Sequence, residues 1–290
     1  MRTPSASRTA LSRRTLLAAG AAVLSGAGGL TAARQARADG TLIWNAWGPL
    51  AGYGVSAECN PGGGGFACGA ADVSITVGSD TADRFSNVNA NPRGIVTYVN
   101  AIGNRRFIDV TPDGAPLALA GYQYLYAVRL PRVPTKDSAP WIPEQTHQMI
   151  QFWDGSNRLW PANKHTLEAA SFWKLNPWRD DYGRVFVYTT DANGALARHD
   201  TGITVPPDVN WHVFDIRVDL EKRVYAGISV DGKWWNPLTN VPLARIHHQD
   251  WGSELALILT AESENAYPSS PDTVTRWTTQ FKDPKLYRLP

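Results

Sequence analysis

The chain has 290 residues, of which 43% are hydrophobic and 19% are charged, as in an ordinary globular protein. Its 28 lysines and arginines against 26 aspartates and glutamates give a net charge of +2, but six of the arginines lie in residues 1–38, which contain no acid. The remaining 22 basic residues against 26 acidic ones give −4. A mildly acidic domain has no electrostatic reason to bind nucleic acid or anionic lipid.

Residues 1–38 have the features of a targeting segment. The stretch Ser12–Leu17, SRRTLL, resembles a twin-arginine motif, a run rich in Ala and Gly extends from Leu16 to Leu30, and Ala36–Ala38 resembles an A-x-A cleavage site. The run is too short and too rich in glycine to span a membrane, which takes about 20 strongly apolar residues. We expect a twin-arginine signal peptide over 1–38, export to the periplasm, cell-wall side or exterior, and no membrane span.

Residues 39–290 are expected to form one domain, since no repeat or long linker divides them. The only two cysteines, Cys59 and Cys68, enclose a short loop that contains the glycine run Gly62–Gly65. In an oxidising compartment this spacing predicts a Cys59–Cys68 disulfide. Two thiols without a nearby histidine do not favour a metal site, and the glycine run lacks the Lys-Ser/Thr of a phosphate-binding loop.

Strand-type runs separated by Gly, Asn, Asp and Pro follow along the chain. They are Val73–Val77, Gly94–Asn100, Arg105–Val110, Gly121–Leu130, Thr146–Asp154, Ser171–Pro177 and Gly183–Thr190. Turns are expected at 102–104 and 191–194, and a short helix near His165–Ala170. This spacing of strands predicts an all-β sandwich rather than βαβ units.

The stretch Trp211–Gly232 is the most regular of these patterns. Apolar and polar residues alternate over Trp211–Leu220, as in a half-buried strand, and a polar break is followed by a second strand over Val224–Val230 and by the turn residues Asp231 and Gly232. This hairpin resembles those of the concanavalin A-like lectin/glucanase superfamily, laminin-G modules and polysaccharide lyases included. The resemblance implies a two-sheet antiparallel jelly-roll sandwich.

The final strands are expected at Glu254–Glu264, Val274–Phe281 and Lys285–Leu289, with the last two returning to the N-terminal strands. One sheet of a jelly roll often lines a groove with the side chains that point away from the core. The mixed strand faces supply His147, Gln151, Trp153, Asp215, Arg217, Glu262 and Glu264 for such a groove.

Three functions compete for these residues. Glu262 and Glu264 lie about 7 Å apart along one strand face, at ~3.3 Å per residue, and would serve as the carboxylates of a glycoside hydrolase. Jelly-roll glucanases, however, carry E-x-D-x-E or E-x-D-x-x-E, and this chain has only E-S-E. The same two glutamates are alternatively ligands for a structural Ca²⁺ ion.

The second function is polysaccharide lyase, which needs a base and a group that neutralises a uronate carboxylate. His147 and Gln151 share a strand face, as in the alginate- and heparin-lyase kind, with Arg217 and Tyr188 as further candidates. The third function is glycan binding without catalysis, in which tryptophans stack on sugar rings. The candidates are Trp153, Trp160, Trp173, Trp178, Trp234 and Trp235, the last two beside a surface turn.

We therefore expect a secreted monomer that binds, and in two of the three cases cleaves, a polysaccharide or other glycan. The alternative is a non-catalytic glycan-binding or extracellular interaction module. No cofactor is required, and no metal ligand set is apparent beyond the Ca²⁺ alternative.

Overall fold

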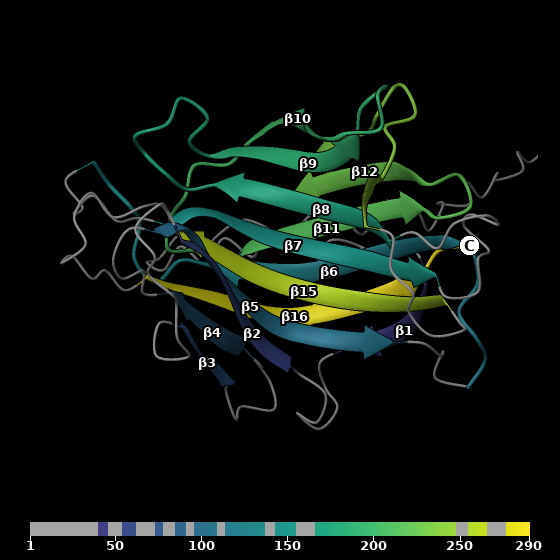
Figure 1. Cartoon of the computed structure of the whole chain (residues 1–290), viewed down its shortest axis with the longest axis horizontal. Coiled ribbons are helices and arrows are strands. Elements are labelled where there is room, and N and C mark those ends of the chain that lie inside the picture. The colour runs from purple at the N-terminus through teal and green to yellow at the C-terminus, as the bar shows by residue number, and fades with distance from the viewer. Residues whose placement is uncertain are drawn as a thin grey trace, which may run out of the picture. The chain divides into compact units, whose positions relative to one another are not determined.

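Sixteen described strands form two antiparallel sheets of eight in the computed structural model of the chain (Figure 1). The structure describes residues 40–45, 54–61, 73–77, 85–90, 96–108, 114–136, 143–154, 166–247, 255–265 and 277–290. No helix occurs within these ranges. The expected all-β, two-sheet jelly-roll sandwich is confirmed.

Sheet A contains the hairpin that the sequence predicted. Its path runs in the order β13-β12-β11-β6-β16-β4-β3, with β1 paired to β16. The bounds are β1 Thr41–Asn45, β3 Val73–Val77, β4 Phe85–Ala90, β6 Gly121–Arg129, β11 His212–Asp219, β12 Val224–Val230, β13 Lys233–Trp235 and β16 Trp277–Arg288.

Sheet B forms the second layer. Figure 1 shows β9, β8, β7, β15 and β5 side by side within the path β10-β9-β8-β7-β15-β5-β2, and β14 pairs with β8. The bounds are β2 Gly54–Pro61, β5 Val96–Ile108, β7 Pro143–Asp154, β8 Thr166–Lys174, β9 Arg184–Thr190, β10 Leu196–Thr204, β14 Ala244–His247 and β15 Leu255–Asn265.

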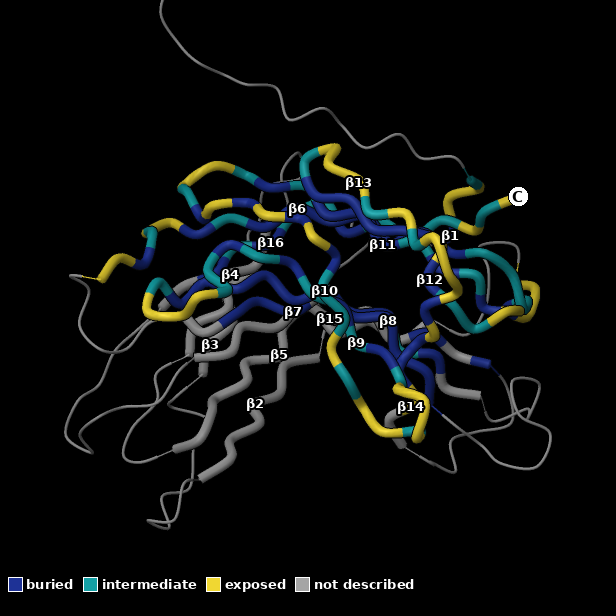
Figure 2. Tube along the Cα trace, turned by 90° about the horizontal axis from the view of Figure 1, so that it is seen from above, coloured by how far each residue is buried: buried dark blue, intermediate teal, exposed yellow. Residues whose placement is uncertain are grey.

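The core lies between the two sheets. Sheet A contributes Phe214 and Ile216, and sheet B contributes Ile150, Phe152 and Trp173, all fully buried. In Figure 2 strand β8 is dark blue along its length and β6 is dark blue between its two end residues, while many turns at strand ends are exposed. Because side chains alternate along a strand, the residues between these core positions point away from the core.

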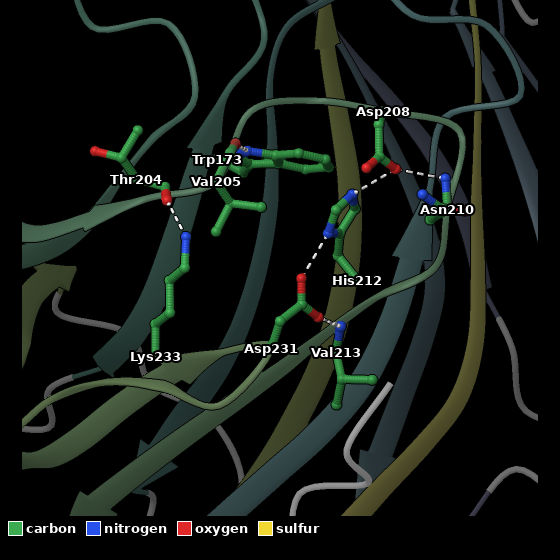
Figure 3. Close-up of polar contacts among 9 residues, drawn as sticks. All are labelled: Trp173, Thr204, Val205, Asp208, Asn210, His212, Val213, Asp231 and Lys233. Atoms are coloured by element: carbon green, nitrogen blue, oxygen red, sulfur yellow. Dashed lines mark hydrogen bonds and ion pairs between the residues drawn. The ribbon is translucent and has the colours of Figure 1, made fainter. Parts of the chain in front are cut away.

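The predicted hairpin is present as β11 and β12. The predicted turn residues that follow it form a second hairpin, between β12 and β13. Asp231 and Gly232 both have positive φ, at 51° and 79°, and they join β12 to β13 as a two-residue loop. Two such residues are typical of the type I′ turn, whose twist matches that of antiparallel strands. Figure 3 shows that the Asp231 carboxylate also bonds the Val213 backbone N–H at 2.8 Å and the His212 ring at 2.7 Å.

A tyrosine hydroxyl ties the two sheets together beside the outermost strands of sheet B. The backbone N–H of Ala170 donates to Tyr225 Oη at 3.0 Å, and this hydroxyl donates to the Tyr188 carbonyl at 2.7 Å. The β8–β9 pairing ends next to these residues, at Ser171 and Val187. The Tyr225 hydroxyl therefore takes the place of the next bond between β8 and β9, and burial raises its pKa far above the usual value for a tyrosine.

Three local predictions are wrong. A helix was expected near His165–Ala170, but Thr166–Ala170 belong to strand β8. The Leu, Glu and Ala of this segment are good helix formers. Pairing with β7 and β14 on either side overrides that propensity. The turn expected at 102–104 is the middle of the long strand β5. The last two predicted strands are one strand, β16, bent by a bulge that contains Asp283 at φ 52°.

Candidate functional site

The face of sheet B that points away from the core carries a row of polar and aromatic side chains. On β7, Ile150 and Phe152 enter the core, so the alternate residues lie on the opposite face. On β8, Leu167, Ala169 and Trp173 enter the core. The residues of this outer face of sheet B are Gln145, His147, Met149, Gln151, Glu168, Ala170, Phe172 and Lys174, with Phe186 and Tyr188 on β9 and Arg198 on β10.

His147 lies in the middle of the row. Its Nε2 atom is 2.7 Å from the amide nitrogen of Gln145, and its ring meets the edge of Phe172 at a centroid distance of 4.4 Å. His147 is 4% exposed and Gln145 is fully buried. The amide N–H of Gln145 donates to the Nε2 lone pair in this arrangement, which fixes the orientation of the imidazole.

A buried cation lies next to this dyad. Lys174 is directly opposite Gln145 in the β7–β8 register, which places the two side chains on the same face as neighbours. The Lys174 ammonium is 3.9 Å from a carboxylate oxygen of Asp181, and its side chain is 5% exposed. The outer face therefore holds a buried lysine, paired with Asp181, beside Gln145.

The row continues across β9 and β10 towards solvent. The Tyr188 and Phe172 rings meet edge to face at a centroid distance of 4.0 Å. The exposed Arg198 lies opposite Tyr188 in register, and its guanidinium is 5.4 Å from the Phe172 ring and 5.9 Å from the Tyr188 ring. Such stacking holds the guanidinium over the aromatic rings while it stays accessible.

A second polar pair lies further along β7 and β8. The Gln151 amide donates to Glu168 Oε2 at 3.0 Å, and Glu168 is 3% exposed. A nearly buried carboxylate needs polar partners, and the Gln151 amide is one of those of Glu168. The pair extends the row of polar groups along the strands from His147.

The predicted glutamates lie on the neighbouring strand. Glu262 is directly opposite His147 in the β15–β7 register, and Glu264 is opposite Gln145. The strands that carry these glutamates and His147, β15 and β7, are neighbours in sheet B. The side chains of Glu262 and Glu264, and that of Trp153 on β7, lie outside the described residues, so their roles stay predictions.

The expected common groove is wrong for Asp215 and Arg217. Both belong to β11, which lies in sheet A and pairs with β6 and β12. Phe214 and Ile216 point into the core, so Asp215 and Arg217 are on the outer face of sheet A. The two sheets pack through their inner faces, and their outer faces are therefore on opposite sides of the sandwich.

The tryptophan candidates have different environments. Trp234 is 44% exposed and Trp178 is 59% exposed, as a stacking surface requires. Trp173 is fully buried in the core, whereas Trp235 is partly buried and packs against the core beside Tyr225. Residue 160 lies outside the described residues.

The sequence analysis missed four polar or charged residues of the outer face of sheet B, namely Gln145, Glu168, Lys174 and Arg198, and the aromatic residues Phe172 and Phe186. The strand was expected to begin at Thr146, one residue too late to include Gln145. Alternation extended by one residue would have placed Gln145 on the face of His147. Arg198 lies on β10, whose sequence, LARHDTGIT, alternates little in hydrophobicity.

The described residues contain no group of three or more His, Cys, Asp or Glu side chains that could hold a metal ion. The Ca²⁺ alternative involves Glu262 and Glu264 and stays a prediction. Cys59 lies on β2, opposite Val99 on β5, but Cys68 is outside the described ranges, and the disulfide also stays a prediction. In the described part of the chain, no helix is long and apolar enough to cross a membrane.

Comparison with known proteins gives no family: no protein-family model and no curated protein matches the sequence. Solved structures with a similar arrangement include a β-1,3-glucanase from Mycobacterium marinum, with 11% identity, 86% of this chain and 100% of that chain covered, and a TM-score of 0.40. An alginate lyase from a Chlorella virus has 12% identity, coverage of 74% and 89%, and a TM-score of 0.39.

A pseudo β-1,3-glucanase and immunostimulatory antigen of Mycobacterium tuberculosis has 12% identity, coverage of 74% and 78%, and a TM-score of 0.37. At these identities and scores the likenesses carry no argument about activity.

The chemistry available on the outer face of sheet B follows from its side chains. A neutral imidazole accepts a proton, and a phenol gives or accepts one. Amide, ammonium and guanidinium groups bind a carboxylate, the guanidinium in a two-pronged geometry. The partly exposed Tyr188 adds aromatic surface between these groups, and the fully buried Phe172 supports its ring. The combination suits a ligand that carries both carboxylates and apolar ring faces.

Proposed function

We propose that this chain is an exported, carbohydrate-active protein that binds a uronate-containing polysaccharide on the outer face of sheet B and cleaves it by β-elimination. The observation that supports the proposal is the row Gln145, His147, Phe172, Tyr188 and Arg198, which combines a base, a phenol, an amide and a guanidinium on adjacent strands. These are the groups that proton abstraction next to a carboxylate requires.

The reaction assigns one role to each group. Gln145 and Lys174 bind the uronate carboxylate, which makes the proton on the adjacent ring carbon more acidic. When the Gln145 N–H turns to the carboxylate, Nε2 of His147 is released and accepts that proton. The C–H bond and the glycosidic C–O bond break, a C=C bond forms within the uronate ring, and the leaving oxygen takes a proton from Tyr188.

Arg198 binds a neighbouring uronate of the same polymer. Adjacent strands are ~4.8 Å apart, so the span from β7 to β10 is about 14 Å, which is too wide for a single sugar ring. The ligand is therefore a polymer that crosses the strands, and the stacked, exposed guanidinium of Arg198 contacts it away from the reacting ring.

The test is an assay on a panel of uronate polymers and neutral glucans. β-Elimination gives an unsaturated uronate that absorbs in the ultraviolet, whereas hydrolysis gives a new reducing end without this absorbance. We expect absorbance with at least one uronate polymer, and a loss of about 100- to 10,000-fold in His147→Ala, the range of general acid–base catalysis. The matched control is His199→Ala, because His199 lies on β10 against Trp235 and outside the row.

The outcomes separate the alternatives. A new reducing end without absorbance would replace the lyase assignment with a hydrolase. Retardation in a gel containing the glycan, without either product, would leave glycan binding alone. No product and no retardation with any polymer would refute the proposal.

Export is a separate part of the proposal. Residues 1–38 carry the twin-arginine-like motif, and a polysaccharide substrate is found outside the cell. Replacing Arg13 and Arg14 by lysines is expected to leave an uncleaved precursor in the cell, measured by fractionation and intact mass. Unchanged export of this double variant would contradict the assignment of the pathway.

A further inference from the structure

A second surface of the sandwich carries cations stacked on tryptophans, on the side opposite the row just described. The Arg129 guanidinium is 4.7 Å from the ring centroid of Trp211, and the Lys282 ammonium is 4.6 Å from the same ring. The Arg217 guanidinium is 4.6 Å from the ring of Trp234. These cations come from β6, β16 and β11, three adjacent strands of sheet A.

All of these groups lie on the outer face of sheet A. Val128, Phe214 and Phe281 point into the core, and Arg129, Arg217 and Lys282 occupy the alternate positions of the same strands. Lys285 also lies on this face, opposite Leu125 beyond the bulge in β16. We call this surface the basic face; its residues are Arg129, Trp211, Arg217, Trp234, Lys282 and Lys285.

The carboxylates near the basic face do not cancel its charge. Asp215 is fully buried and accepts hydrogen bonds from Gln123 at 2.9 Å and from Arg217 at 3.1 Å. Asp219 bonds Lys222 at 2.7 Å, and Asp283 lies in the bulge between Lys282 and Lys285. With Lys222 included, five cations stand against three carboxylates in a chain that is net acidic after residue 38.

The tryptophans give this face apolar, flat surface beside the charges. Trp234 is 44% exposed and lies over Gly227, where a Cβ atom would be 3.7 Å from the indole ring. The indole of Trp234 thus lies against the sheet at Gly227. A guanidinium stacked on an indole is held in place, and here Arg129 also donates hydrogen bonds to Gln280 and Arg217 to Asp215. The charge of Arg129 attracts an anion, and the exposed part of the indole suits a sugar ring.

We infer that the basic face is a second binding site, for an anionic polysaccharide. Arg129 and Gln123, the β6 neighbour of Arg217, are six residues apart, about 20 Å at ~3.3 Å per residue. Two cation–tryptophan clusters at this separation bind a polymer through several weak contacts. The inference shares its ligand class with the proposed function but uses a different face, and it holds whether or not the chain is a lyase.

The test measures binding to the full chain in the His147→Ala background, so that no polymer is consumed. The polymer probes are polygalacturonate, heparin and the neutral glucan laminarin, measured by gel retardation and calorimetry at low and high salt. Phosphatidylglycerol vesicles are a fourth probe, measured by calorimetry. We expect Arg129→Gln with Lys282→Gln to weaken binding of an anionic polymer at least tenfold at low salt, and to reduce its salt dependence. Arg217→Gln is expected to weaken it further.

The controls separate charge from structure. Arg129→Lys with Lys282→Arg keeps the charges and should keep most of the affinity, while an unchanged melting temperature shows that the double glutamine variant is folded. Lys136→Gln is the matched control, because Lys136 lies 6.0 Å from the ring of another tryptophan, Trp178, away from this face.

Three results would overturn the inference: unchanged affinity in the double glutamine variant, equal binding of laminarin, or binding only to phosphatidylglycerol vesicles. Failure of the lyase proposal would be seen differently. The wild-type chain would then give no ultraviolet-absorbing product, while the binding of anionic polymers to the basic face would persist.

Discussion

His212 Nδ1 lies 2.7 Å from Oδ2 of Asp231, across the mouth of the β12–β13 turn, and Oδ1 of the same carboxylate accepts the N–H of Val213. The His212 ring in turn packs edge to face on Trp173, at a centroid distance of 4.8 Å. One turn residue thus holds a buried histidine against the core of the sandwich (Figure 3).

Replacing Asp231 by alanine is expected to lower the free energy of unfolding by about 1–3 kcal/mol, because the buried His212 ring and the Val213 N–H lose their acceptor. Alanine also tolerates the positive φ of residue 231 poorly. Asp231→Asn is the control: it accepts the left-handed conformation and can still accept from Val213, so its loss should be smaller. Urea unfolding followed by tryptophan fluorescence measures both, and equal stability of all three proteins would contradict this account.

Asp208 makes stability depend on pH in a defined direction. Burial opposes ionisation of its carboxyl group, but the N–H of Asn210 and the charge of His212 outweigh it and lower the pKa below the usual 3.8. A lowered pKa in the folded state stabilises the protein above the pKa of the unfolded state, and this contribution is lost as the pH falls through the folded value.

Asp208→Asn should therefore be less stable than the wild type at neutral pH, with a difference that disappears well below pH 3.8. The effect is small because the carboxylate is half exposed. Melting temperatures measured between neutral and acidic pH test it. A difference that grows on acidification would have the wrong sign.

Tyr225→Phe removes the hydroxyl that joins Ala170 to Tyr188. Both backbone groups lie in a buried region, and leaving them without this partner is expected to cost about 1–3 kcal/mol. Urea unfolding measures the change. Tyr182→Phe serves as the control, because the Tyr182 hydroxyl makes a long bond of 3.4 Å to Pro134 and its removal should cost little. Equal losses for the two variants would argue against the bridging role of Tyr225.

Arg198→Ala is expected to raise KM for a uronate polymer about fivefold while kcat changes little, since ~1 kcal/mol of binding is lost away from the reacting ring. Arg198→Lys keeps the charge but not the planar stacking on Phe172 and Tyr188. Its KM should therefore lie between those of the wild type and Arg198→Ala. Initial rates over a range of polymer concentrations give both constants. A fall in kcat at unchanged KM would move Arg198 to the reacting centre.

The alternation of apolar and polar residues within one strand correctly predicted which side chains share a face. It placed Phe214 and Ile216 on one face and Asp215 and Arg217 on the other, as observed. The alternation does not show which strands are neighbours, because register and sheet membership depend on contacts between distant segments. Asp215 was therefore grouped with His147, although their strands belong to different sheets.

The local exceptions have physical causes of the same kind. Thr166–Ala170 consists largely of helix formers, and only its place between β7 and β14 makes it a strand. The interior of β5 contains Gly103 and Asn104, which signal a turn in isolation, but pairing with β15 and β2 carries the strand through them. Arg198 gave no signal because its strand alternates weakly, and its role depends on rings from β8 and β9.

Strand β16 lies inside sheet A, where it pairs with β4, β6 and β1, including Thr41 against Arg288. The first and last described strands are thus joined directly, across nearly the whole length of the chain. Because β16 is synthesised last, sheet A cannot form completely until the whole chain has been made. Pairing between segments so distant in sequence is slow. A chain that stops before residue 277 leaves β4, β6 and β1 without their shared neighbour, so even a short deletion at this end should yield aggregated protein rather than a smaller sandwich.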